Sequence, residues 1–299
     1  MRIIEPLRHR IVGRLIGFII LLAPSFWLLT SPLYSQQLGL FGKYTLSGQY
    51  SMQPGIVLFS NDFESDDTDL VPTWDYNNNV TYNTLSTDYA HSGTRAGRFY
   101  YYKATGDPPS QDSNRWVSKI LAAQMHIFMR GYVYFASPSE SQKGQGIQRK
   151  LIWVGDETTA AGSGGTWDAI LDSWETNTGP PSTLSLSFVT QGSACHGDSP
   201  QDWMPGTPDL SWDTWYSLEI EVGLNTPVPD PGPFDGTLRV WLDGDLIWER
   251  TDIKINGNCT TPFTFFSIGR QMNRYVSATE VSEYRYWDDV VISSSYIGP

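Results

Sequence analysis

The chain has 299 residues, of which 40% are hydrophobic and 17% are charged. It therefore carries enough apolar side chains for a large core and too little charge for a disordered protein. Its formal net charge of −12 argues against nucleic acid as a partner, because phosphate binding needs a basic surface. Two cysteines are too few for a disulfide framework or a four-cysteine zinc site.

The first 35 residues differ in composition from the rest. Four arginines precede an uncharged apolar stretch at 15–30, and small and polar residues follow at 31–37. This order is typical of a cleaved secretory signal. An uncleaved membrane anchor is the alternative, although the apolar stretch is short for a span and is interrupted by Pro24.

Removal of residues 1–35 leaves a net charge of −15. We therefore expect an acidic protein that is secreted, or held at the cell surface or in the periplasm, with residues 36–54 as a linker. Membrane contact is expected only if the first segment stays uncleaved. In an oxidising compartment, Cys195 and Cys259 form either one disulfide or two free thiols, and the sequence leaves both open.

From residue 55 onward, short runs of β-branched and aromatic residues recur between clusters of Gly, Pro, Asn and Asp. Many of these runs alternate between apolar and polar residues, which is typical of strands buried on one face. The predicted strands are 56–59, 96–102, 127–135, 147–154, 183–190, 215–222, 237–242, 263–268 and 283–292. Asp243 and Gly244 form a two-residue hairpin signal. The pattern predicts one all-β domain over 55–299, a jelly-roll sandwich of two antiparallel sheets.

Several segments in order span nearly the whole of this domain. They are Asp-Phe-Glu at 62–64, His-Ser-Gly-Thr-Arg-Ala at 91–96, Gln-Arg-Lys-Leu at 148–151, Asp-Gly-Thr-Leu-Arg-Val-Trp-Leu-Asp-Gly at 235–244 and Tyr-Trp-Asp-Asp-Val-Val-Ile at 286–292. Together they resemble the jelly-roll, concanavalin A-like polysaccharide lyases, a group that includes alginate and glucuronan lyases. The resemblance implies β-elimination of an extracellular polysaccharide that contains uronic acids, with no cofactor required.

Elimination from a uronic acid polymer needs three chemical functions. The sugar carboxylate must be neutralised, which Arg, Lys, Gln or Asn can do, because screening it acidifies the neighbouring C5 proton. A base such as Lys, His or Tyr must remove that proton. A third group must protonate the leaving oxygen, and the resemblance implies a tyrosine. All three should occupy polar positions of alternating strands.

Three predicted strands offer such residues, and in one of them, 183–190, the following Gln191 continues the polar face of Ser185 and Ser187. In 128–135, Arg130, Tyr132 and Tyr134 share a face. In 147–154, Gln148 and Lys150 share a face, while Arg149 falls on the opposite one with Leu151 and Trp153. The predicted catalytic residues are Lys150, Tyr132, Tyr134 and Arg130. The predicted substrate-binding residues are Gln148, Arg149, Gln191, His126 and Arg270. Ordinary solvated strand faces would show the same pattern.

A structural metal site is a further expectation. Asp62 and Glu64 lie near the first strand and Asp288 lies in the last, and terminal strands often pair in such folds. Carboxylate oxygens suit Ca²⁺. The alternative is a solvated acidic edge that discourages strand pairing.

Three other functions stay open at this point. A lectin-like carbohydrate-binding module would use the same aromatic residues and cations without turnover. A jelly-roll glycoside hydrolase needs two carboxylates about 5–10 Å apart, and Asp168 and Asp172 share a face, although the glutamate pair of the jelly-roll glucanases is missing. A structural or adhesion protein would fit the acidic surface.

Overall fold

Strands make up the regular structure of the described part of the chain. The computed structural model describes residues 55–65, 70, 73–104, 113–138, 147–161, 167–175, 183–192, 202–204, 206–226, 234–255, 261–274 and 280–299. The predicted signal and linker and both cysteines lie outside these residues. Within the described ranges, no helix is long and apolar enough to cross a membrane.

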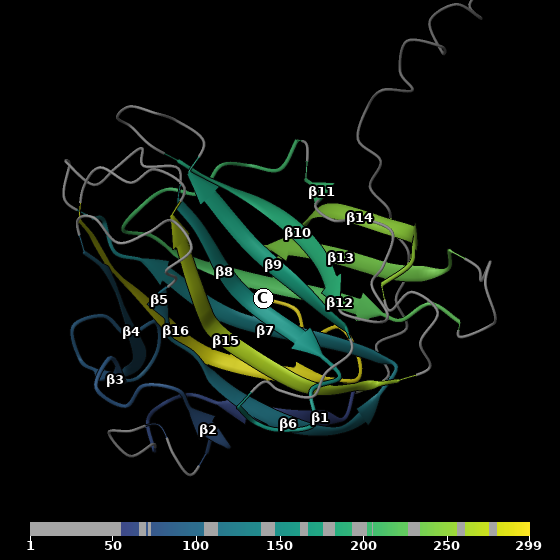
Figure 1. Ribbon diagram of the computed structural model, residues 1–299, viewed down its shortest axis with the longest axis horizontal. Helices are drawn as coiled ribbons and strands as arrows, with labels where there is room; N and C mark the ends of the chain where they lie inside the picture. The colour runs from purple at the N-terminus through teal and green to yellow at the C-terminus, as the bar shows by residue number, and fades with distance from the viewer. Residues whose placement is uncertain are drawn as a thin grey trace, which may run out of the picture. The chain divides into compact units, whose positions relative to one another are not determined.

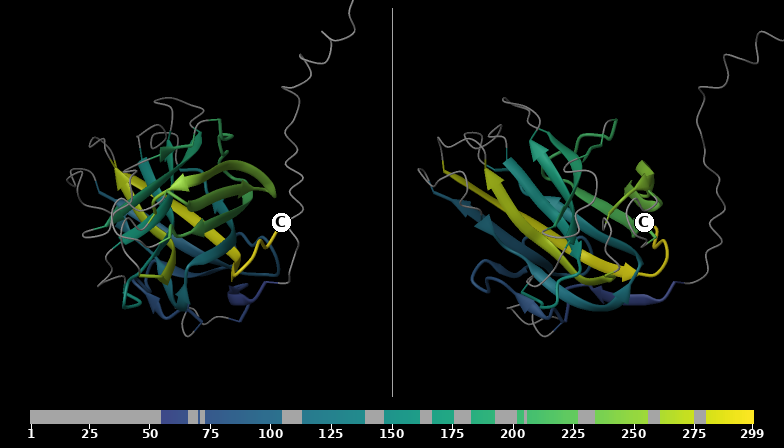
Figure 2. Two further views of the ribbon diagram at one scale, coloured as in Figure 1. Left: turned by 90° about the vertical axis from the view of Figure 1, so that its right-hand side faces the viewer. Right: turned by 45° about the vertical axis from the view of Figure 1, so that its right-hand side comes forward.

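The strands form two sheets, which Figures 1 and 2 show as two layers, and every strand pair is antiparallel. Sheet A contains, in spatial order, β14 (Asp245–Ile253), β13 (Gly236–Leu242), β12 (Trp215–Gly223), β7 (His126–Phe135), β16 (Val281–Ser293), β4 (Ala96–Lys103) and β3 (Asn83–Ser86), with β1 (Val57–Asn61) pairing with β16. Sheet B contains β11 (Asp202–Trp203), β10 (Leu184–Gly192), β9 (Trp167–Glu175), β8 (Ile147–Gly155), β15 (Phe263–Arg274), β6 (Val117–Gln124) and β2 (Tyr76–Asn77), with β5 (Ser113–Asn114) pairing with β15. The predicted sandwich is confirmed.

The core lies between the two sheets and follows the predicted alternation. On β10, Leu184, Leu186 and Phe188 are buried in it. Large aromatic side chains from both sheets, such as Trp287 of sheet A and Phe266 of sheet B, are fully buried there. Burial of one such side chain stabilises the fold by about 1.5–3 kcal/mol. The face of each strand that carries the apolar residues therefore turns inward.

The predicted hairpin turn and each predicted strand are present. Asp243 and Gly244 have φ values of 52° and 88°, which the twist of a two-residue hairpin requires. Of the longer strands, β6 and β9 were not predicted, and β14 was expected only through the hairpin turn that precedes it. On β9 the alternation is blurred because Ile170, like Trp153 and Phe265, belongs to a small apolar cluster separate from the main core, so both faces of the strand carry apolar residues.

Candidate functional site

Strand β8 presents Gln148 and Lys150 on the outer face of sheet B, as predicted. Its pairing with β9 shifts register between Lys150 and Ile152, and Leu151 and Ile152 both pack in the main core. The shift turns Trp153 outward, so the prediction that Trp153 faces the same way as Arg149 is wrong. The Lys150 Nζ lies 5.1 Å from the centre of the Trp153 ring. A β-bulge re-aims a side chain in this way.

Strand β15 brings Arg270 to the same ring. Its pairing with β8 is irregular between Ile268 and Gln271, next to the β8 shift. The Arg270 guanidinium carbon lies 4.0 Å from the centre of the Trp153 ring and 4.2 Å from that of Trp116. Two cations, Lys150 and Arg270, therefore contact one indole on a solvent-facing sheet.

A buried hydrogen-bond network from neighbouring strands of sheet B holds the Gln148 side chain. The Gln148 amide and the Ser187 hydroxyl both donate to the Asp172 carboxylate. The Asn273 amide donates to Gln148 Oε1 at 3.2 Å. Burial raises the pKa of Asp172 to about 6, against the opposing effects of the Ser187 and Gln148 hydrogen bonds and the Lys150 charge. The network fixes the position of the Gln148 side chain.

We call this set the sheet B site. Its members come from β8, β9, β10 and β15 and are Gln148, Lys150, Trp153, Asp172, Ser187, Arg270 and Asn273. A further acid, Glu157, lies at one end of the site. Burial raises its pKa to about 7, although the charge of Arg270 acts in the opposite direction. Gln191, another predicted substrate-binding residue, pairs with Asp168 at the end of β10 and β9, and both side chains lie outside the described residues.

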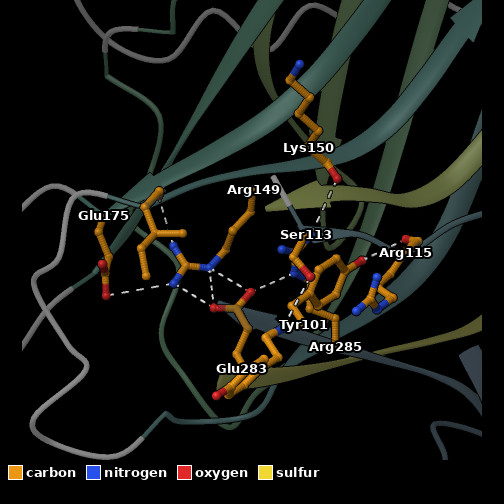
Figure 3. Close-up of polar contacts among 10 residues, drawn as sticks. Tyr101, Ser113, Arg115, Arg149, Lys150, Glu175, Glu283 and Arg285 are labelled. Carbon is orange, nitrogen blue, oxygen red and sulfur yellow. Dashed lines mark hydrogen bonds and ion pairs between the residues drawn. The ribbon is translucent and has the colours of Figure 1, made fainter. Parts of the chain in front are cut away.

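Arg149 faces the interior, so its predicted role in substrate binding is wrong. It is fully buried, because alternation on β8 turns it away from Gln148 and Lys150. Its guanidinium donates to Glu283 of sheet A at 2.8 Å and lies 3.8 Å from Glu175 of sheet B. Glu283 also accepts from Arg285 at 2.8 Å. Figure 3 shows this cluster below β8, with the Lys150 side chain pointing away from it.

The predicted set Arg130, Tyr132 and Tyr134 shares one face, as predicted, but that face belongs to sheet A. Strand β7 pairs with β12 and β16 of sheet A, and its other residues, such as Met129 and Val133, are in the core. These three side chains therefore lie on the opposite side of the sandwich from Lys150. The structure does not bring the predicted catalytic lysine and tyrosines together.

Another predicted residue, His126, lies with Arg130 on the outer face of sheet A. Arg130 donates to the Gly298 carbonyl at 2.6 Å and lines a pocket of about 350 Å³ with Asp62 and Asp289. His126 Nε2 lies 2.7 Å from a Glu221 oxygen. Neither contacts the sheet B site.

The three predicted metal ligands lie near one loop. Glu64 accepts from the backbone N–H groups of Thr94 and Arg95 at 2.8 and 2.7 Å, and Asp288 accepts from those of His91 and Ser92 at 2.9 and 3.1 Å. Asp62 accepts from the Glu64 N–H at 3.1 Å. In the described ranges, no three His, Cys, Asp or Glu side chains form a group that could hold a metal ion. Calcium binding stays a prediction.

Sequence reasoning missed several members of the sheet B site. Asp172 was noticed as a partner of Asp168, but its contact with Gln148 depends on the pairing of β8 with β9. Arg270 is one of the predicted substrate-binding residues, but both it and Trp153 reach the outer face through register shifts that period-two counting cannot detect. The local signal that could reveal these residues is a Trp or Arg that falls out of phase with the neighbouring core residues.

Comparisons with known proteins identify the fold. No protein-family model matches the chain, and no curated protein matches it. Solved structures do match. The endo-β-1,4-glucuronan lyase from the fungus Trichoderma reesei is 13% identical, with a TM-score of 0.53 over 80% of this chain and 96% of its own. A marine alginate lyase from Aplysia kurodai is 15% identical, with a TM-score of 0.55 over 82% of this chain and 100% of its own.

These similarities cover most of the chain and confirm the resemblance found in the sequence at the level of fold. Both alignments also take in nearly the whole of the solved lyases, 96% and 100% of their chains. The described domain therefore has the jelly-roll fold of the polysaccharide lyases.

Proposed function

We propose that this chain is a secreted polysaccharide lyase that cleaves a uronic acid-containing polymer by β-elimination at the sheet B site. The observation that carries the proposal is the convergence of Lys150 and Arg270 on the Trp153 ring. In a chain of net charge −12, two cations beside one aromatic ring create a local site for an anionic sugar. The basic, apolar and small residues at 1–37 support secretion.

The first step is recognition of the sugar carboxylate. Arg270 would supply its counter-charge and Gln148 would donate a hydrogen bond to it, while Lys150 acts in the next step from its neutral amine form. Neutralisation of the carboxylate acidifies the C5 proton and stabilises the enolate-like state that follows. The buried Trp153 ring would hold the Lys150 and Arg270 side chains in place beside the sugar.

The second step is proton transfer by Lys150. Its amine takes the C5 proton, and the electrons of the C5–H bond form the C4–C5 double bond while the C4–O bond breaks. The resulting ammonium returns a proton to the leaving oxygen, so charge and protons balance. Asp172 is a positioning residue in this scheme, because it holds Gln148 without facing the solvent.

The experiment follows the ultraviolet absorbance of the new double bond, conjugated with the carboxylate, on a panel of alginate, glucuronan, pectate and heparin-type polymers. We expect product with the unaltered chain and none with Lys150→Ala. Lys119→Ala is the matched control, since this β6 lysine is held by Asp75 at 2.8 Å away from the site. No product from any polymer, with the protein shown to be folded, would overturn the proposal.

A lectin-like binding module is the second candidate. It is favoured by the position of Tyr132 and Tyr134, which the structure places on the other sheet. This function predicts uronic acid polymer binding that Lys150→Ala weakens, with no double bond formed at any enzyme concentration.

A further inference from the structure

The outer face of sheet A carries a continuous line of aromatic rings. Neighbouring ring centres along it are 4.7–6.4 Å apart. We call the line the tyrosine patch, and its members in order are Tyr82, Tyr100, Tyr284, Tyr286, Tyr134 and Trp215. They come from β4, β16, β7 and β12 and from the residue before β3, so the line runs across the strands.

The patch combines a buried floor with exposed rings. Tyr134 and Tyr286 are nearly buried, whereas Tyr284 is 40% exposed. Two flanking tyrosines are equally accessible: Tyr89, stacked 4.6 Å from Tyr134, and Tyr102, 6.4 Å from Tyr100. Contiguous exposed aromatic surface of this kind marks an interaction site.

Charges beside the patch are engaged within the protein. Arg98 pairs with Asp88 at 3.4 Å, and Arg115 donates to the Tyr100 and Asn114 carbonyls at 2.9 and 2.6 Å. Each arginine also lies over a ring of the patch, Arg98 5.7 Å from the centre of Tyr284 and Arg115 4.3 Å from that of Tyr82. Unlike in the sheet B site, no two of these cations share one ring. An uncharged ligand fits it better than an anionic one.

We infer that the tyrosine patch binds a neutral polysaccharide chain. Tyrosine offers a flat apolar face for the C–H groups of a sugar and a hydroxyl that exchanges hydrogen bonds with sugar hydroxyls. Rings on neighbouring strands recur about every 5 Å, so sugar units of an extended chain can stack on those rings of the patch that are exposed, such as Tyr82 and Tyr284. A line of rings suits such a chain better than the compact central cluster typical of a protein interface.

The inference goes beyond the proposed function and does not depend on it. Tyr134 and Lys150 belong to different sheets, and their side chains lie on opposite outer faces of the sandwich. A neutral glycan on the patch would leave Lys150 accessible to an anionic polymer. The protein would then hold two chemically different polysaccharides at once.

Native affinity electrophoresis in gels containing neutral β-glucan, xyloglucan or glucomannan tests the inference. The unaltered full chain should be retarded by at least one of these polymers. The double variant Tyr102→Ala/Tyr284→Ala removes two exposed rings and should weaken the association at least tenfold. Phe234→Ala is the matched control, because Phe234 is 52% exposed but lies outside the patch. It should be retarded like the unaltered chain, and so should Lys150→Ala.

Three results would overturn the inference. They are no retardation of the unaltered chain by any neutral polymer, equal retardation of the double variant, and a dimer in analytical ultracentrifugation that the double variant dissociates. The last would show that a second copy of the chain covers the patch. Loss of lyase activity in Lys150→Ala with unchanged binding of the neutral polysaccharide separates this test from that of the proposed function.

Discussion

The buried cluster of Arg149, Glu283, Arg285 and Glu175 links the two sheets, and replacement of Arg149 by Met tests its contribution. Glu283 accepts from Arg149 Nε at 2.8 and 3.1 Å with its two oxygens. Arg149→Met leaves this buried carboxylate paired with Arg285, at 2.8 Å. Removing one partner of a buried ion pair costs about 3–5 kcal/mol.

For a domain of this size, that loss lowers Tm by about 6–20 °C. Urea unfolding followed by circular dichroism gives the free energy directly. Arg250→Met is the matched control, because its ion pair with Asp252 is on the surface and is worth about 0–1 kcal/mol.

The pH dependence of this loss adds a second, sharper expectation. Burial alone would raise the pKa of Glu283, but the charges and hydrogen bonds of Arg149 and Arg285 hold it below its usual value. In Arg149→Met one of the two cations that oppose the effect of burial is gone, so the pKa of Glu283 rises. Protonation of Glu283 at low pH then removes the buried charge and restores part of the lost stability. The deficit should therefore shrink as pH falls from 7 to 5. A loss under about 1 kcal/mol at pH 7, equal to that of a surface pair, would refute the reasoning.

Three other predictions concern stability and positioning. Burial raises the pKa values of Asp172 to about 6 and of Glu157 to about 7, so the folded state holds protons that the unfolded state has released and stability should fall as pH rises from about 4 to 7. The urea midpoint should be higher at pH 5 than at pH 8, with a smaller difference in Glu157→Gln, and a midpoint that rises with pH would contradict this. Gly269 has φ of +80° and a Cβ there would lie 2.7 Å from a Phe99 ring carbon, whereas Gly206 has φ of +82° and open space. Gly269→Ala should cost about 2–5 kcal/mol and Gly206→Ala about 1–2 kcal/mol, and equal losses in thermal unfolding would rule out the steric account. Asp172→Asn should raise KM more than Ser185→Ala, a change on the neighbouring strand β10, because it loosens Gln148, and an unchanged KM would remove Asp172 from the site.

The sequence predicted the strands well because alternation is a local property. Leu184, Leu186 and Phe188 could be assigned to one face from spacing alone, and so could Arg130, Tyr132 and Tyr134. Spacing does not say which sheet a strand joins. Strands β7 and β8 follow one another in the chain yet belong to different sheets, and this separated two sets of residues predicted to act together.

The errors within β8 have a different physical cause. Alternation placed Arg149 opposite Lys150, and the presence of Glu283 on the facing sheet is what makes its burial favourable. That partner is 134 residues away in the chain. The outward turn of Trp153 depends on a register shift between β8 and β9, which is set by pairing geometry and not by residue type.

In the proposed function, the uronic acid chemistry occurs at Lys150 on sheet B and not at Tyr134 on sheet A. The most direct measurement compares kcat for Lys150→Ala and Tyr134→Phe on the same polymer, from the appearance of the C4–C5 double bond. Loss of a proton-transfer group lowers kcat by about 10²–10⁴-fold, so we predict a loss of that size in Lys150→Ala and an unchanged kcat in Tyr134→Phe. The reverse result, with Tyr134→Phe inactive and Lys150→Ala active, would place the reaction on the other face and contradict the account.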